Sequence, residues 1–167
     1  LFRSPSGYFG VHPFVEEHLE AVFIMRTQVD YKTNSAACKQ AGLDFGRSAL
    51  VPMDNTGVPS SSVIAIKPNL TAHDPVDEKR GMSLEDTMGI TTDAFFVEGI
   101  ITALGELGVP GKNVHMRDIN GNRIIEPRGY VAMSQRAGAS VTLQKGRIAT
   151  ADDAKDEESF VWRDVPK

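Results

Sequence analysis

Short apolar runs alternate along this chain with stretches in which apolar residues recur every three or four positions. Continuous runs of about five apolar residues are typical of buried strands, and the wider spacing is typical of amphipathic helices. The runs predict strands at 21–25, 62–66, 113–117, 139–143 and 160–162. The periodic stretches predict helices at 34–50, 93–107 and 127–137.

Strands that alternate with helices predict a parallel sheet with right-handed crossovers. We therefore expect an α/β fold of three-layer-like architecture, with a mostly parallel sheet, alternating helices and Rossmann-like topology. No G-x-G-x-x-G follows a predicted strand, so the dinucleotide-binding fingerprint is missing. Residues 1–20 show no sustained period and predict an extended lead-in to a single α/β domain at 21–167. Because the last apolar run lies close to the end, we expect this domain to be the N-terminal part of a longer one.

Composition narrows the class of protein. The 167 residues are 41% hydrophobic and 24% charged, which is typical of a soluble globular domain. The net charge of −4 gives no basic patch for nucleic acid, and no apolar run approaches the roughly 18 residues of a membrane span. Cys38 is the single cysteine, so this chain alone has no ligand set for an iron–sulfur cluster. The chain has no haem-binding motif either, and its sequence does not identify a cofactor.

Polar residues follow two of the predicted strands. Lys67 and Asn69 come after the strand at 62–66, and Arg117 and Asp118 end the strand at 113–117. Ligands of open α/β sheets bind beyond the carboxyl ends of the strands. If these strands are neighbours, Lys67 would hold an anion and Asp118 would accept a proton or bind a metal. These two are the candidate catalytic residues, although polar residues also end strands for structural reasons alone.

Further candidate residues lie beside these strand ends. Thr91, Thr92 and Asp93 begin a predicted helix, where free N–H groups bind anions, but all three residues are also good helix caps. His115 alternates with two apolar neighbours and should face away from the core.

The long polar segment 71–89 is expected to be a binding loop or lid. His73, Asp74 and Asp77 within it are weak candidates for metal ligands, and a solvated surface is the alternative.

Several short motifs in order resemble one protein family. The sequence Ile-Ala-Ile-Lys-Pro-Asn-Leu at 64–70 is followed by Gly-Ile-Thr-Thr-Asp at 89–93, by a helix pattern at 96–101 and by Glu-Leu-Gly at 106–108. From about Ala21 to Pro166 the chain is similar to the domain of unknown function 362 family. Glu-Pro-Arg-Gly-Tyr at 126–130 resembles a subgroup of it, whereas Ala94 stands where the family usually has proline.

The resemblance implies a bacterial or archaeal protein, often exported by the twin-arginine route, so a periplasmic location is the expectation and a cytoplasmic one the alternative. Some relatives would carry attached ferredoxin-type domains. The family domain would also continue past this chain with a second motif that contains lysine and histidine. The subgroup should have a cysteine after the third strand, where this chain has Asn120-Gly121-Asn122, which argues against a thiol-dependent role.

Two classes of function remain. In the first, the chain is an enzyme or part of one, and it binds a small anionic metabolite at the strand ends through Lys67, Asn69, Thr91, Thr92 and Arg117. In the second, it is a non-catalytic binding or assembly subunit. Its partner would then be the remainder of its own chain or another protein subunit.

Overall fold

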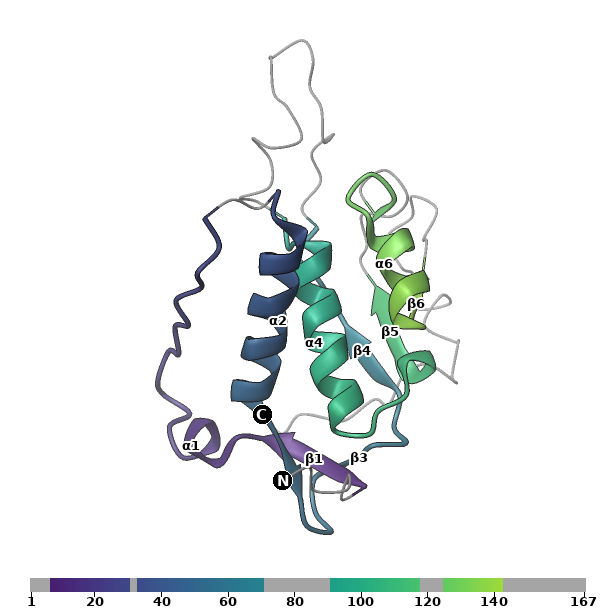
Figure 1. Cartoon of the computed structure of the whole chain (residues 1–167). Coiled ribbons are helices and arrows are strands. Elements are labelled where there is room, and N and C mark those ends of the chain that lie inside the picture. Colours follow the sequence, from purple (N-terminus) through teal and green to yellow (C-terminus); the bar gives the residue numbers. More distant parts are fainter. Residues whose placement is uncertain (1–6, 31–32, 71–90, 118–124, 143–167) are drawn as a thin grey trace, which may run out of the picture.

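A computed structural model describes residues 7–30, 33–70, 91–117 and 125–142 (Figure 1). The strands are β1 Tyr8–Val11, β2 Leu50–Met53, β3 Val58–Pro59, β4 Ile64–Ile66, β5 Val114–Arg117 and β6 Ser140–Thr142. The helices are α1 Pro13–Glu16, α2 Ser35–Ala49, α4 Ala94–Glu106, the short 3-10 helix η2 Gly111–Asn113, and α6 Tyr130–Ala137. The three long helices and the strands at 62–66, 113–117 and 139–143 confirm the sequence predictions, apart from shifts at their ends.

The strands form two sheets, so the prediction of one mostly parallel, Rossmann-like sheet is wrong. An antiparallel sheet has the order β2-β1-β3, and a parallel sheet has the order β4-β5-β6. The central strand β1 comes from the segment expected to be an extended lead-in, and Tyr8 of β1 pairs with Met53 of β2. Pro52 follows α2 and lies in β2 at the edge of its sheet, where a missing N–H is tolerated.

The predicted strand at 21–25 is also absent. This segment has no regular secondary structure, and the side chains of Val22 and Ile24 are 86% and 89% exposed. An apolar run becomes a buried strand only where a neighbouring strand accepts its backbone hydrogen bonds. Among the described residues, no strand pairs with this segment.

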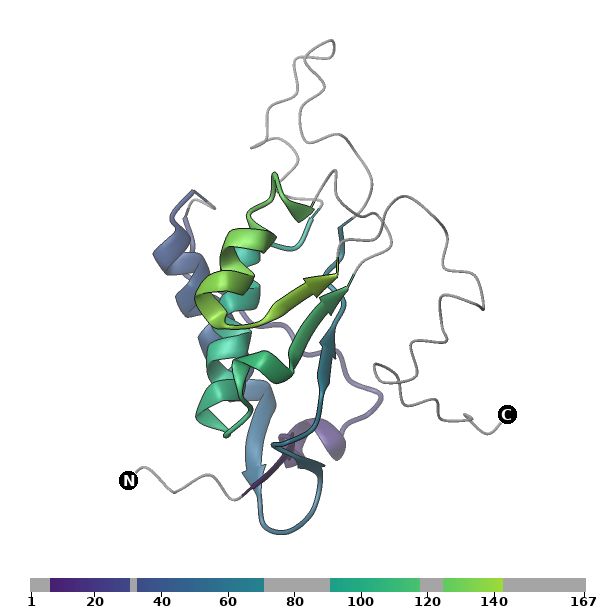
Figure 2. The ribbon, with the colours of Figure 1, turned by 90° about the vertical axis from the view of Figure 1, so that its right-hand side faces the viewer.

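All three long helices lie on one side of the parallel sheet, so this part of the molecule has two layers rather than the expected three (Figure 2). The order β4-β5-β6 follows the chain, and crossovers of one hand then place their helices on one face. A crevice for ligands arises where strand order reverses. The described strands of this sheet show no such reversal, so a candidate site must be argued from the residues themselves.

The core lies between this sheet and the helices. Val114 and Met116 of β5 are buried beneath Val97 and Ile101 of α4 and Met133 of α6. These side chains belong to one cluster of buried residues: Phe9, Leu70, Ala94, Val97, Ile101, Leu104, Val109, Val114, Met116, Ile125, Tyr130 and Met133.

Helix α2 packs on α4 through glycines. A Cβ atom at Gly42 of α2 would lie 1.9 Å from the carbonyl oxygen of Phe96, and one at Gly99 of α4 would lie 2.1 Å from the carbonyl oxygen of Lys39. The missing side chains therefore bring the two backbones into contact. Gly46 of α2 packs in the same way, since a Cβ atom there would lie 2.6 Å from the Cβ atom of Ala103 of α4.

Candidate functional site

Lys67 and Arg117 lie at equivalent places at the carboxyl ends of two adjacent parallel strands. The register pairs Ile66 of β4 with Met116 of β5, and each cation is the next residue in its chain segment. Adjacent strands are about 4.8 Å apart. The condition that the strands at 62–66 and 113–117 be neighbours is therefore met.

Alternating burial assigns the polar side chains to one face of the parallel sheet. In the segment 64–70 the even-numbered residues are buried or half-buried and the odd-numbered residues are exposed. In β5, Val114 and Met116 are buried, whereas His115 and Arg117 are partly exposed, which confirms that His115 faces away from the core. We call the side away from the helices the open face; its residues are Ala65, Lys67, Asn69, His115, Arg117 and Ser140.

A pair of hydrogen bonds connects the segment after β4 to the start of α4. The Asn69 N–H donates to Thr92 Oγ1, and the Thr92 N–H donates to the Asn69 carbonyl oxygen, both at 3.0 Å. The buried hydroxyl of Tyr130 donates to the Thr92 carbonyl oxygen at 2.9 Å. These bonds give Thr92 a positioning role, because they hold the segment after Lys67 in place.

Thr91 and Asp93 take structural positions at the start of α4. The side chain of Thr91 is buried, at 9% exposure. Asp93 is the N-cap of α4, and its Oδ1 accepts a hydrogen bond from the Phe96 N–H at 3.0 Å. The capping interpretation of this segment is therefore the one that the contacts support.

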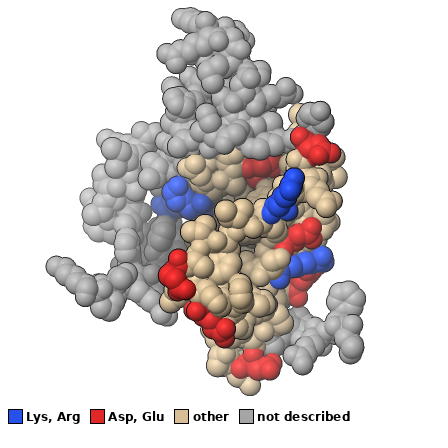
Figure 3. All heavy atoms as spheres, turned by 90° about the vertical axis from the view of Figure 1, so that its left-hand side faces the viewer, with Lys and Arg blue, Asp and Glu red and all other residues tan. Residues whose placement is uncertain are grey.

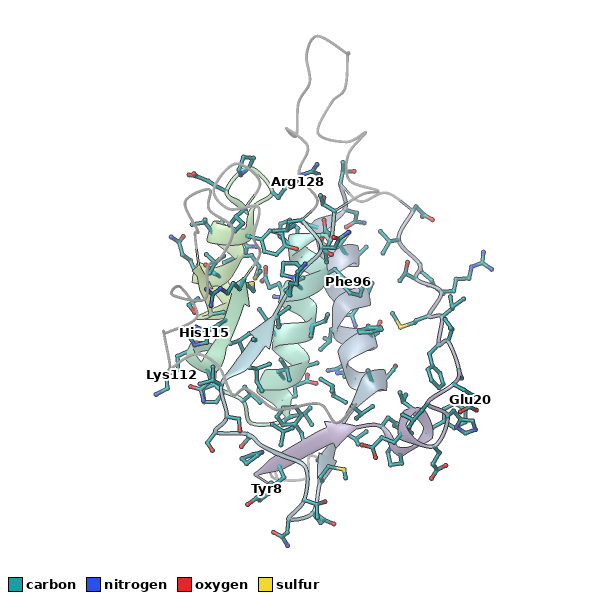
Figure 4. The ribbon with its side chains drawn as sticks, turned by 180° about the vertical axis from the view of Figure 1, so that it is seen from behind. Tyr8, Glu20, Phe96, Lys112, His115 and Arg128 are labelled. Carbon is teal, nitrogen blue, oxygen red and sulfur yellow. The ribbon has the colours of Figure 1, made fainter. Side chains whose placement is uncertain are left out.

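Arg128 brings another cation to this end of the sheet, from the turn that precedes α6. Figure 4 shows it near the end where the strands finish, opposite to the end that carries Lys112. Burial lowers the pKa of the Arg128 guanidinium, and the charge of Asp93 counteracts part of this effect. The sequence offers no reason to choose Arg128 as a site residue, because the helix predicted at 127–137 includes it. The helix instead begins after Gly129, whose φ is 79°.

The open face also carries a hydrogen-bonded pair that the sequence does not reveal. His115 and Ser140 are direct partners in the register of β5 and β6. The distance between His115 Nδ1 and Ser140 Oγ is 2.6 Å. Figure 4 shows His115 on the side of the sheet away from α4. The outward direction of His115 follows from its alternation, but its partner depends on a register that no local pattern specifies.

A second group of charges lies in the helical layer, away from the strand ends. Glu98 of α4 is 5% exposed, and its carboxylate contacts Lys39 Nζ at 2.8 Å and Arg136 Nη2 at 2.6 Å. Burial alone would raise the pKa of Glu98, but hydrogen bonds from Arg136 and Lys39 hold it below its ordinary value. Because the two cations come from α2 and α6, this triad joins three helices.

The metal candidates His73, Asp74 and Asp77, the catalytic candidate Asp118 and the predicted strand at 160–162 lie outside the described residues. Within the described ranges, no three His, Cys, Asp or Glu side chains are grouped to hold a metal ion. Cys38 is buried in α2. In the same ranges, no helix has both the length and the apolar character needed to cross a bilayer.

The face over α2 has a mixed charge. Figure 3 shows blue and red side chains separated by uncharged surface, and no continuous basic field among the residues described on this face. Lys67 and Arg117, by contrast, start from adjacent positions at the ends of β4 and β5. No protein-family model, curated protein or solved structure matches the chain, so the resemblance to the domain of unknown function 362 family stays a prediction.

Proposed function

We propose that this chain binds a small anionic metabolite at the carboxyl ends of β4 and β5, as an enzyme or as part of one. The observation that carries this proposal is the register of Lys67 and Arg117 at the ends of adjacent parallel strands. Both side chains are cationic and start from adjacent positions on neighbouring strands. An anion bound by both cations would gain two charge-assisted hydrogen bonds.

The local structure supports a fixed position for Lys67. Pro68 restricts the backbone before and after it, and the mutual bonds of Asn69 and Thr92 hold the next residue. The Ile-Lys-Pro-Asn sequence thereby alternates core-facing apolar residues with exposed polar ones. This physical role for each position also supports membership in the domain of unknown function 362 family, which we propose on the order of its motifs.

The test is a calorimetric titration with phosphates and carboxylates. Lys67→Met keeps the apolar stem and removes the charge, so we expect intact folding and a loss of about 10- to 150-fold in affinity for the preferred anion. Lys112→Met is the matched control, because it removes the same charge at the opposite end of the sheet (Figure 4). It should change the affinity by less than about twofold, since that charge lies outside the site and is screened. Equal binding by wild type and Lys67→Met would remove Lys67 from the site.

A role as an assembly subunit is the second candidate. It is favoured by the exposed apolar side chains of the irregular segment before α2, namely Leu19 at 86%, Val22 at 86% and Ile24 at 89% exposure. Neighbouring exposed apolar side chains commonly mark a protein–protein contact. The two candidates use different surfaces, so each can be tested without disturbing the other.

A further inference from the structure

We propose that residues 20–26 pair with the same residues of a second copy of this chain, as two antiparallel strands related by a two-fold axis at Phe23. This inference rests on the assembly role given above as the second candidate function. It adds the partner, which is another molecule of this chain, and the register in which the two segments pair.

The segment that follows α1 offers its backbone to another strand. Figure 1 shows it as an extended trace along the outer side of the molecule, between α1 and the start of α2. Residues 22–26 have no regular secondary structure, and within the described ranges their backbone groups make no hydrogen bond. Such N–H and C=O groups can pair with an extended strand of another chain.

The exposure of the side chains alternates along this segment. Val22 and Ile24 are almost fully exposed, whereas Phe23 and Met25 are 45% and 36% exposed. The ring centroids of Phe23 and Phe14 of α1 lie 5.7 Å apart, and residues 25–29 line a cavity whose other wall is α2. The segment therefore rests on its own chain on one side and presents Val22 and Ile24 on the other. A period of two is the pattern of a strand with one covered face.

Opposite charges flank the apolar run at equal distances from its centre. Glu20 precedes Phe23 by as many residues as Arg26 follows it. An antiparallel pair centred on Phe23 would place Glu20 of each copy opposite Arg26 of the other. The same register would place Val22 opposite Ile24, and two-fold symmetry makes each contact twice. Opposite charges and apolar pairs that face each other across a ladder both stabilise it.

Both charged side chains can make this contact. Glu20 and Arg26 are exposed, and neither forms an ion pair with a described residue. Figure 4 shows Glu20 at the outer surface beside α1. By the alternation of the segment, both side chains share the outward face with Val22 and Ile24. A second copy matches this face, because it supplies the opposite charge at each end and apolar side chains between them.

Other pairings of the two segments fit the pattern less well. A parallel pair would place Glu20 opposite Glu20 and Arg26 opposite Arg26, and like charges directly opposite destabilise a ladder. An antiparallel shift by one residue would pair outward side chains of one copy with covered side chains of the other. A shift by two residues would set a charged side chain opposite an apolar one and remove both ion pairs. The segment therefore selects one register.

The contact is short, which determines the strength to expect. Interfaces that bury less than about 1,200 Å² are typical of weak complexes. We therefore expect a dimer with a Kd on the order of 10–100 µM.

The experiment is sedimentation equilibrium of the full chain and its charge variants. Glu20→Arg and Arg26→Glu each replace two ion pairs with two like-charge contacts, so each should raise the Kd of the dimer by about 2- to 30-fold. The double variant Glu20→Arg/Arg26→Glu exchanges the two charges and should restore the Kd to within about twofold of the wild-type value.

The matched control is Glu126→Arg. It makes the same change of charge in the turn before α6, which lies across the helical layer from the segment (Figure 1). Because a distant exposed charge is screened, this variant should change the Kd by less than about twofold.

Disulfide formation tests the position of the two-fold axis. Phe23→Cys would place two thiols directly opposite each other, where strand Cα atoms lie about 4.5–5.5 Å apart and a disulfide fits. Mild oxidation should therefore link this variant into a covalent dimer. Leu19→Cys should stay unlinked although Leu19 is more exposed, because the same register sets its two copies about 20 Å apart or more. The native Cys38 is buried in α2 and should remain unlinked in both variants.

The outcomes separate this inference from the assembly candidate. A wild type that stays monomeric well above the expected Kd, assemblies larger than a dimer, or a dimer that Glu20→Arg leaves unchanged would overturn the inference. Failure of Phe23→Cys to link would do the same. If a monomeric wild type still binds a hydrophobic dye through Val22 and Ile24, the assembly candidate stands with a different partner. Dye binding that Val22→Ser/Ile24→Ser leaves unchanged would remove the apolar surface on which both rest.

Discussion

The glycine contact between α2 and α4 provides the sharpest prediction of the fold, because α4 contains its own control. Gly99→Ala and Gly105→Ala are the same substitution, six residues apart in one helix. A Cβ atom at Gly99 would meet three backbone atoms of α2, the nearest at 2.1 Å. A Cβ atom at Gly105 would have no such atom within 4 Å.

The magnitude follows from the movement that the new methyl group requires. Carbon and oxygen atoms reach ordinary contact at about 3.4 Å, so α2 must move by more than about 1 Å. A gap of that size forfeits a quarter to a half of the dispersion energy at the contact. Overpacking of this kind costs about 1–3 kcal/mol of stability. We expect a cost at the upper end for Gly99→Ala, because the atoms in the way belong to the backbone and cannot rotate aside. The higher helix propensity of alanine offsets up to about 1 kcal/mol of this loss of stability.

We therefore expect Gly99→Ala to lower the free energy of unfolding by about 2 kcal/mol and Gly105→Ala to raise it by up to about 1 kcal/mol. For a chain of this length, a difference of about 3 kcal/mol corresponds to roughly 6–12 °C in Tm. Urea and thermal unfolding followed by circular dichroism measure both values. If both variants shift stability in the same direction, the close backbone contact does not exist and the reasoning fails.

The remaining predictions concern the buried acid and the exposed apolar segment. Because the folded pKa of Glu98 lies below its ordinary value of 4.5, the stability that Lys39 and Arg136 confer is present above that pH and is lost as pH falls through the folded pKa. Glu98→Gln should lower the free energy of unfolding by about 1–2 kcal/mol at pH 7, a modest amount because both cations are nearly half exposed. Its stability should also depend less on pH than that of the wild type between pH 5 and 2. A stability difference between the two proteins that stays constant over this range would contradict the prediction. The exposed apolar side chains of Leu19, Val22 and Ile24 should make the wild type self-associate and bind a hydrophobic dye. Val22→Ser/Ile24→Ser should abolish both and leave stability within about 0.5 kcal/mol. A wild type that stays monomeric in light scattering and binds no dye would show that this segment does not mediate self-association.

Local patterns predicted the helices well, because each has its own signal. Asn34 caps α2, Asp93 is the cap residue among the three candidates at the start of α4, and the buried faces follow the helical period. Gly138, in the left-handed conformation, ends α6 next to the predicted helix end at 137. Such features depend on residues only a few positions apart.

The errors concern pairing between distant segments. No local pattern around Tyr8–Val11 predicts that these residues pair with Leu50–Met53. The apolar run at 21–25 is a strong strand signal, yet it pairs with no strand among the described residues. The candidate site likewise has one part that local patterns predict and one part that depends on pairing between distant segments. Lys67 and Arg117 follow strong strand signals and were predictable, whereas the contact of His115 with Ser140 requires the register of β5 and β6.

The register of the parallel sheet also bears on the order in which the chain folds. Pairing β4 with β5 closes a loop about twice as long as the pairing of β5 with β6. Each doubling of a loop adds about 0.6 kcal/mol to the entropy cost of closure, which is roughly a factor of three in the probability of contact. The unit of β5, α6 and β6 should therefore form early. The His115–Ser140 pair would then form before β4 pairs with β5 and brings Lys67 next to Arg117. The open face would be completed in this late step of folding.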